Sequence, residues 1–380
     1  MHVKEKKVEL IELFYDLIYV YAISNLTLLI EEPEGGVLTW DMFFVYIITS
    51  MAVIQAWLFM TNYVNLYCTW KWYEYALVVF NMSAAVLMSN TITVSWLESS
   101  MAFICSMMTM IGCIIALYAI QIRKREADPK AAKQALSILG IVMSIYILAL
   151  IINNMGYEKL SLMIVILNII LGMFLPLVKK ANFDHKMISF PHLVERLELL
   201  TIITFGEGII GITEFFEVQQ FNIIGPLSFM ILIFMFGTYV CQVHLMCNHH
   251  QVTNPTRMVW GHYLIIIAIN LVTVALLYFH NKEIDPIFTA IMMIASLAFF
   301  QLALIPASKY FHPEFSRTKM DLAVTLAIIA VGAVIILLFP ESPYAFMSGS
   351  LIITGGNFMY FLNRYLSNRV RKPKVPAAEA

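Results

Sequence analysis

The stretch LSLMIVILNIILGMFLPLV, residues 160–178, contains no charged side chain and decides the class of the fold. An α-helix needs about 20 apolar residues to cross the hydrocarbon core of a bilayer. Outward from this stretch, in both directions, runs of similar length follow one another, separated by charged, Pro or Gly residues. The sequence therefore predicts an all-α protein, a polytopic transmembrane helix bundle of about 12 spans.

The composition agrees with a membrane protein and excludes several other classes. Of the 380 residues, 60% are hydrophobic and 13% are charged, whereas soluble domains have about 45–50% and about 25%. Soluble globular and disordered proteins are therefore excluded. The formal net charge of −1 offers no strong field for DNA or RNA, so we expect no nucleic-acid partner. The expected partners are membrane lipids and a small molecule or ion that the sequence does not identify.

The 24 Lys and Arg residues fall almost entirely in alternate connections between the apolar runs. Lys159 and Lys282 are the exceptions, and Arg196 lies within a run. Because the cytoplasmic segments of membrane proteins are rich in Lys and Arg, this distribution predicts a multi-pass protein of the bacterial cytoplasmic membrane. Both termini are expected to face the cytoplasm.

The spacing of the runs suggests an internal repeat. An offset that aligns Glu12 with Glu195 also brings Trp40 near Ile223. Because each half would hold an even number of spans, the halves would enter the membrane in the same direction, as parallel repeats. Accidental spacing among short loops is the alternative. The predicted parts are an N-terminal six-helix half (1–180), a C-terminal six-helix half (181–370) and a cytoplasmic tail (371–380).

Ionisable side chains within the runs are concentrated in the first and the seventh. An ionised group near the bilayer centre costs at least about 2.5 to 3.5 kcal/mol, so it usually faces the bundle interior or water. In the first run Glu12 and Asp16 stand one helical turn apart, and Tyr19 extends the same face. In the seventh run His192 and Arg196 have the same spacing. These faces predict a charge network inside the bundle.

Arg196 is the only base within a run, and an unpaired buried charge carries a desolvation penalty of several kcal/mol. We therefore expect Arg196 to contact Asp16 or Glu12, which should lie at similar depth. Glu207 stands about 16 Å further along the seventh helix and is the carboxylate predicted to bind a proton or a cation. An alternative is that three acidic side chains only reach back to the aqueous interface: Glu12, Glu195 and Glu198.

Gly206, Gly208 and Gly211 surround Glu207. Glycines so placed either allow two helices to approach closely or let the helix open and offer its backbone to a ligand. The sequence leaves both interpretations open.

Motifs in these two runs resemble the low temperature requirement protein A (LtrA) family of bacterial membrane proteins. One is ELFYDL at residues 12–17, and the other is His192-x-x-Glu195-Arg196 followed by Gly206-Glu207. Asn62, with Trp57 and Thr61, looks like a weaker third match. The chain departs from the family pattern at Glu198, where a Gly is usual, and at Asn65, where an Asp often stands. The resemblance implies a link to growth at low temperature and supplies no molecular activity.

A group of metal-ligand residue types follows the eighth run: Cys241, His244, Cys247, His249 and His250. Their spacing matches no closed zinc finger, so interfacial residues at a helix end are the alternative to a soft-metal site. His192 and Glu195 could ligate a metal only together with other helices. No metal is assigned, and a cofactor stays unknown.

No nucleophile elbow or phosphate-binding loop occurs between the runs, and the loops are too short for a catalytic domain. We therefore predict a secondary transporter or permease-like protein that uses buried carboxylates for proton or cation coupling, and not an enzyme in the first instance. A non-transporting sensor or scaffold and a membrane-embedded enzyme acting on a lipid-like substrate are the alternatives. The candidate site residues are Glu12, Asp16, Tyr19, Asn62, His192, Glu195, Arg196 and Glu207.

Overall fold

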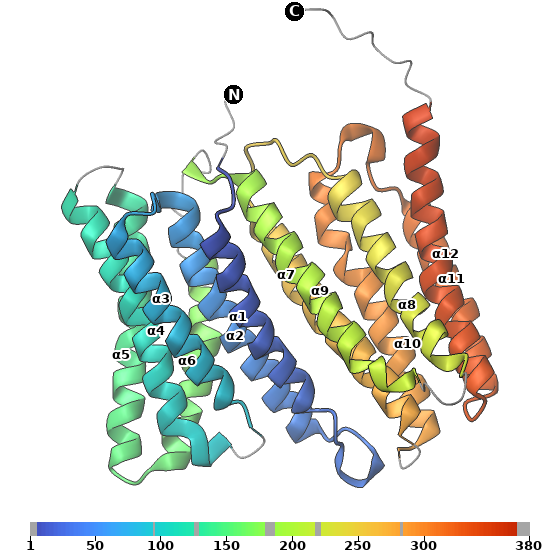
Figure 1. Cartoon of the computed structure of the whole chain (residues 1–380), viewed down its shortest axis with the longest axis horizontal. Helices are drawn as coiled ribbons and strands as arrows, with labels where there is room; N and C mark the ends of the chain where they lie inside the picture. The colour runs from blue at the N-terminus through green and yellow to red at the C-terminus, as the bar shows by residue number, and fades with distance from the viewer. Residues whose placement is uncertain are drawn as a thin grey trace, which may run out of the picture. The chain divides into compact units, whose positions relative to one another are not determined.

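The computed structural model describes residues 6–93, 96–124, 129–178, 187–216, 222–281 and 284–370. The predicted cytoplasmic tail (371–380) and Lys282 lie outside the described residues. Within the described part every long element is an α-helix (Figure 1). The prediction of an all-α helix bundle is confirmed.

Twelve long helices follow one another along the described chain. They are α1 (Leu10–Leu28), α2 (Trp40–Tyr67), α3 (Trp72–Asn90), α4 (Trp96–Lys124), α5 (Pro129–Asn154), α6 (Glu158–Val178), α7 (Phe190–Gly211), α8 (Ile224–Tyr239), α9 (Thr256–His280), α10 (Pro286–Ala303), α11 (Lys319–Leu338) and α12 (Pro343–Val370). A π-helix, η5 (Val240–Leu245), continues α8.

Ten of these helices are long and apolar enough to cross a membrane; α3 and α7 are the two that do not meet that criterion. In α7 the reason is charge, because Glu195, Arg196 and Glu198 fall within one turn and Glu207 follows in the same helix. The chain is therefore a polytopic membrane protein, and its seventh helix is too charged to face lipid on all sides.

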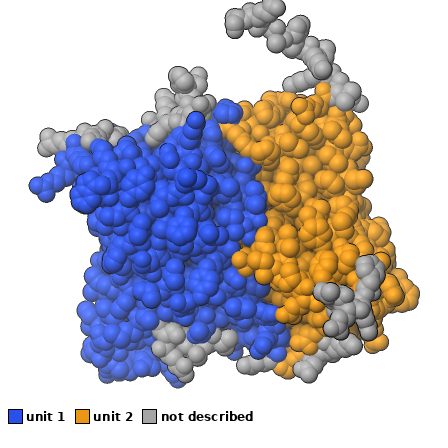
Figure 2. Space-filling model, viewed as in Figure 1, with its two compact units in different colours: residues 1–34, 38–203, 250–254 blue, residues 35–37, 204–249, 255–380 orange. Residues whose placement is uncertain are grey.

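The chain divides into two compact units, which Figure 2 colours separately. Unit 1 comprises residues 1–34, 38–203 and 250–254, and unit 2 comprises residues 35–37, 204–249 and 255–380. The division falls inside α7, after Ile203. The parallel repeat with its boundary at residue 180 stays a prediction.

In unit 1, helices α3 to α6 pack consecutively, while α2 packs against α4 and α6 and α1 packs against α2 and α3 (Figure 1). Polar side chains join neighbouring helices by donating to backbone carbonyls. Gln55 of α2 donates to Ile169 O of α6 at 3.0 Å, and Asn81 of α3 donates to Met110 O of α4 at 2.9 Å. Such bonds are typical of helix contacts in membranes, where few polar groups compete for them.

In unit 2 the main helix pairs are α9 with α10, α11 with α12, and α8 with α12. Helices α11 and α12 approach closely because Gly332 and Gly349 face each other. A Cβ added to either glycine would meet the carbonyl oxygen of the other. Small residues at a helix contact allow this backbone approach, as is common in membrane proteins.

Candidate functional site: a buried charge cluster

Helix α1 carries two buried carboxylates on one face. Glu12 is 1% exposed and Asp16 is 0% exposed, and the four-residue spacing stacks them on successive turns. Glu9 is the N-cap of α1, and its backbone N–H lies 3.5 Å from Glu12 Oε1. Glu12 thus stands at the third helical position, where a carboxylate satisfies a free amide of the first turn.

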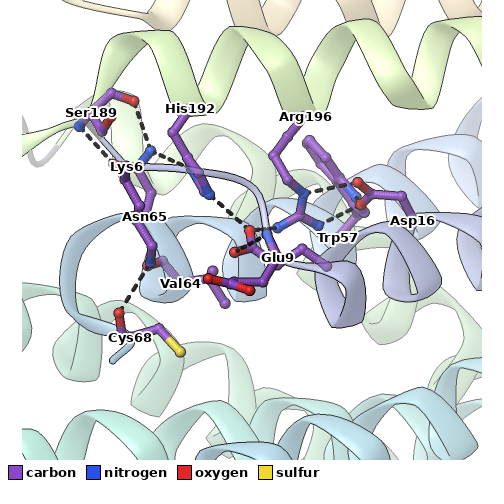
Figure 3. Close-up of polar contacts among 11 residues, drawn as sticks. Lys6, Glu9, Asp16, Trp57, Val64, Asn65, Cys68, Ser189, His192 and Arg196 are labelled. Atoms are coloured by element: carbon purple, nitrogen blue, oxygen red, sulfur yellow. Dashed lines mark hydrogen bonds and ion pairs between the residues drawn. The ribbon is translucent and has the colours of Figure 1, made fainter. Parts of the chain in front are cut away.

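Helix α7 brings a base to these carboxylates. Arg196 donates from Nε to Asp16 Oδ2 at 2.9 Å and from Nη2 to Asp16 Oδ1, and its Nη1 donates to Glu12 Oε2 at 3.0 Å (Figure 3). The guanidinium is 1% exposed. A planar fork of donors is suited to this two-point contact, which a lysine could not reproduce. The contact expected from the depth of the residues is present to both carboxylates.

Aromatic rings complete the surroundings of Arg196. The indole N–H of Trp57, on α2, donates to Asp16 Oδ1 at 2.7 Å. The Arg196 Cζ lies 5.5 Å from the centre of the Trp57 ring and 5.8 Å from that of Tyr15. Cation–π contacts of this kind are strongest where water is excluded, and both rings are fully buried. Asp16 is therefore held by three donors and is the fixed counterion of Arg196.

His192 lies one turn before Arg196 and extends the cluster toward α2. Its Nε2 is 2.9 Å from Glu12 Oε2, and its Nδ1 is 3.1 Å from Asn65 Nδ2. The backbone N–H of Ser189 donates to Asn65 Oδ1 at 3.0 Å, which assigns the amide so that Nδ2 faces the histidine. Because Nδ1 must then accept, the ring proton of the neutral imidazole sits on Nε2, where no described acceptor is well aligned although Glu12 Oε2 lies 2.9 Å away.

Lys6 lies beside the cluster, before α1 begins. Its ammonium donates to Val64 O and, at 3.1 Å, to Cys68 O, two carbonyls at the end of α2 (Figure 3). A cation at a helix C-terminus is favoured by the free carbonyls and the helix dipole. Burial nevertheless lowers the pKa of Lys6 below its ordinary value, against the attraction of nearby acidic groups that include Glu12. The cluster thus has a half-buried amine at its edge.

The carboxylates of Asp16 and Glu12 differ in how many of their oxygens accept hydrogen bonds. Asp16 accepts on both oxygens, from Arg196 and Trp57. Glu12 accepts from Arg196 on Oε2, which also lies 2.9 Å from His192 Nε2, whereas Oε1 has only the 3.5 Å contact to the Glu9 amide. With His192 neutral, the two carboxylates and one guanidinium carry a formal charge of −1, which the Lys6 ammonium at the edge of the cluster balances. Glu12 Oε1 is therefore the oxygen with unused capacity to accept a proton or a small cation.

The structure separates the other predicted site residues from this cluster. Tyr19 is buried and its hydroxyl lies 3.1 Å from that of Tyr15, so it belongs to the surroundings of the cluster and not to its charges. Asn62 is exposed and lines a cavity of about 80 Å³ between α2, α4, α5 and α6. Glu195 is exposed on the other side of α7. Glu207 is half-buried and makes no hydrogen bond or ion pair to a described residue.

The glycines around Glu207 serve helix packing. A Cβ on Gly208 would lie 2.8 Å from Thr273 Oγ1 of α9, and a Cβ on Gly211 would lie 3.1 Å from Thr273 Cγ2. Gly206, by contrast, has no atom within 4 Å of the corresponding position. Helix α7 continues through all three residues to Gly211. Of the two interpretations left open by the sequence, close helix approach is the one that these contacts support.

Within unit 2 the cysteines and histidines after α8 bond to the backbone. The Cys247 thiol donates to Gln242 O at 3.4 Å and to Ala307 O at 3.6 Å. His249 Nε2 lies 3.0 Å from Val243 O. The five cysteines are free thiols. These contacts account for the burial of Cys247 and the orientation of His249 without a ligand.

Three residues of the cluster were not predicted from the sequence: Lys6, Trp57 and Asn65. Trp57 and Asn65 are eight residues apart on α2, which places them near one face about two turns apart. A polar Asn toward the end of a long apolar helix, in register with a Trp, is the signal that could have indicated them. For Lys6 the sequence holds no such signal, because its contacts depend on where the end of α2 lies.

Comparison with known protein families identifies the family of the chain. A family model described as bacterial low temperature requirement A protein (LtrA) matches residues 7–352. The matched range includes α1, α2 and α7, and so every residue of the charge cluster except Lys6. No curated protein matches the chain.

Proposed function

Since the chain belongs to the bacterial low temperature requirement A (LtrA) family and is an integral membrane protein, we propose that it is a secondary transporter or permease-like protein. It couples to a proton or another cation through the buried cluster of Glu12, Asp16, His192 and Arg196. In this proposal the protein lies in the bacterial cytoplasmic membrane with both termini in the cytoplasm, and it takes part in growth at low temperature, as the family's name states.

The observation that supports coupling is a set of ionisable side chains held without exposure inside the helix bundle of a membrane protein. Burying charges in this way is costly, and apolar residues of similar volume often stabilise a protein as well or better. Ionisable groups within membrane helices therefore indicate ion pathways and proton relays more often than structural contacts alone. Glu12, Asp16 and Arg196 together carry a charge of −1 that only Lys6, at the edge of the cluster, balances, and with the free Oε1 of Glu12 this gives the cluster a place for one exchangeable positive charge.

The unequal use of the two carboxylates divides their roles. Asp16 holds Arg196 and keeps α1 attached to α7. Glu12 lies between two donors, Arg196 and His192, and is the carboxylate that exchanges its proton or cation. The His192 tautomer fixed by Asn65 carries its proton on Nε2, 2.9 Å from Glu12 Oε2, so a rotation of the ring that aligned this N–H would let a proton pass through the imidazole to that oxygen. Glu207 is a second candidate for exchange, because it is half-buried and has no described partner.

Charge movement tests the proposal without knowledge of the substrate. Purified protein is reconstituted into proteoliposomes on a solid-supported membrane, and transient currents are recorded after jumps in pH, Na⁺ or K⁺ concentration. Wild-type protein should give a transient current for at least one of these ions. Glu12→Gln should abolish it while the protein stays folded, because the amide oxygen can still accept from Arg196. Glu195→Gln, the same change of side chain at an exposed position of α7, is the matched control and should keep the current.

Two results would overturn the proposal. One is the absence of any current from folded wild-type protein in all three jumps, which would favour the sensor or scaffold alternative. The other is a wild-type current in Glu12→Gln, which would remove the cluster from the coupling mechanism and leave Glu207→Gln as the next variant.

A further inference from the structure

A second charged cluster lies in unit 2, where η5, the start of α11 and the end of α12 meet. Its acidic residue, Asp321, is buried at the third position of α11. Asp321 accepts from the backbone N–H and hydroxyl of Thr318 and from the Tyr360 hydroxyl at 2.7 Å, and it forms an ion pair with Arg364 at 2.8 Å. These donors occupy both carboxylate oxygens, so Asp321 has little capacity for a further cation.

Arg364 also makes its contacts within the protein. Besides its ion pair with Asp321, its Nη2 donates to the backbone oxygens of Phe315 and Ser316. It therefore fastens α12 to the turn that precedes α11. Removing Arg364 would disturb folding, so its substitution is no test of ligand binding, although its buried Nη1 makes no well-aligned hydrogen bond to a described residue.

Arg317 is the cation that the cluster leaves without a counterion. It is half-buried, its one described hydrogen bond is a long contact of 3.5 Å to Gln242 Oε1, and its guanidinium stacks 6.0 Å from the Phe361 ring. Burial lowers the pKa of Arg317 below its ordinary value, because the attraction of Asp321 does not offset the loss of hydration and Arg364 adds repulsion. Two guanidinium groups against one carboxylate give the cluster a formal charge of +1.

Gln242 supplies an unused donor beside Arg317. Its side chain is 0% exposed, and its Nε2 has no hydrogen-bond partner among the described residues. Because Oε1 of the same amide faces Arg317, the unused N–H group lies close to the guanidinium. Gln242 belongs to the π-helix η5, and such wide turns occur often at functional sites. A buried donor without an acceptor destabilises the fold unless a ligand or water satisfies it.

The surroundings indicate what kind of anion the site takes. Apolar and aromatic side chains pack beneath it, among them Phe315 and Phe361. On the first turn of α11, next to Arg317, Met320 is 66% exposed and Leu322 is 38% exposed. A base at the end of a membrane span, with exposed apolar side chains beside it, stands at the level of lipid headgroups.

We propose that Arg317 and the Gln242 amide bind the phosphate group of an anionic phospholipid such as phosphatidylglycerol. The guanidinium presents its free donors to the phosphate oxygens, and the amide N–H donates to a third. The acyl chains lie along the exposed apolar residues of α11. This site is independent of the charge cluster in unit 1 and of transport.

Native mass spectrometry of the full chain tests the site. Protein in detergent is titrated with phosphatidylglycerol, with phosphatidylcholine, or with inorganic phosphate alone. Phosphatidylglycerol should bind more tightly than phosphatidylcholine, and phosphate alone should bind weakly because it lacks the chains. Arg317→Gln should weaken phosphatidylglycerol binding about tenfold, the change expected for one lost charge-assisted contact. Arg369→Gln, an exposed arginine near the same end of α12, is the matched control and should bind as the wild type does.

Gln242→Met separates ligand binding from folding. Removing an unpaired buried donor should raise the thermal midpoint of the lipid-free protein while weakening phosphatidylglycerol binding. If Gln242 had only a structural role, its replacement would not both raise the thermal midpoint and weaken lipid binding. Gln242→Met therefore tests the proposed site even if Arg317→Gln does not fold. Equal binding of the two lipids, or wild-type phosphatidylglycerol binding in both variants, would overturn the proposal. Equal affinity for phosphate and phosphatidylglycerol would instead identify a free-phosphate site and refute the lipid.

Discussion

Replacing Arg196 with Met removes the one arginine of the unit 1 cluster while keeping a side chain of similar length. The variant loses three hydrogen bonds to carboxylates and leaves Glu12 and Asp16 one turn apart, about 6 Å along the helix. Two unit charges at that separation repel by about 3 kcal/mol at an effective dielectric constant near 20. Adding the lost bonds and subtracting the relieved desolvation of the guanidinium gives a destabilisation of about 3 to 5 kcal/mol.

Unfolding in mixed micelles with increasing SDS, followed by tryptophan fluorescence, measures this loss. The exposed change Glu195→Gln should stay within about 0.5 kcal/mol of wild type. The neutral combination Glu12→Gln, Asp16→Asn and Arg196→Met should recover most of the stability, because no uncompensated charge remains. The loss in Arg196→Met should also be smaller at pH 5 than at pH 8, since a proton on either carboxylate removes the repulsion. Stability of Arg196→Met equal to that of Glu195→Gln would refute the reasoning.

Three further predictions concern packing, thiol chemistry and orientation. Gly208→Ala should destabilise the protein by about 1 to 3 kcal/mol through overpacking, whereas Gly206→Ala on the same helix should be neutral or slightly stabilising. Unfolding in SDS compares the two variants, and equal effects would contradict the packing role of Gly208. Burial raises the pKa of the Cys68 thiol to about 12. Maleimide labelling of Cys68 should therefore be slow at pH 8, speed up toward pH 12 and become fast in SDS. Fast labelling of Cys68 in the folded protein at pH 8 would contradict its burial. Finally, a cysteine at Tyr157 should label from outside intact cells and one at Lys124 should not, and the reverse pattern would invert the proposed topology.

The class of the fold could be predicted because the requirement for a membrane span is local. Any run of about 20 apolar residues meets it regardless of its neighbours, and residues 160–178 lie within α6. The repeat is different, since it requires a superposition of the two halves. The repeat would match each helix with the one six places later in the chain. Three packed helix pairs of unit 1 then correspond to three packed pairs of unit 2: α3–α4 to α9–α10, α5–α6 to α11–α12, and α2–α6 to α8–α12. This agreement supports the repeat, which stays a prediction until the halves are superposed.

For the site, periodicity on a single helix was informative and contacts between helices were not. The four-residue spacings identified Glu12 with Asp16 and His192 with Arg196, because helix geometry alone places each pair on one face. The rotation of α2 about its axis decides that Asn65 reaches the cluster while Asn62, three residues earlier, lines a separate cavity. That rotation depends on how α2 packs, and no local pattern in the sequence reports it.

The distance along the chain between the partners of the cluster has a consequence for biosynthesis. Asp16 and its base stand 180 residues apart, and translation at about 5 to 20 residues per second needs roughly 10 to 40 s to cover that interval. During this time α1 has left the ribosome with two carboxylates and no arginine. Helix α1 must therefore enter the membrane while Glu12 and Asp16 are protonated, hydrated or in contact with the insertion machinery. When α7 is synthesised, Arg196 supplies the counterion that stabilises α1 in the bundle.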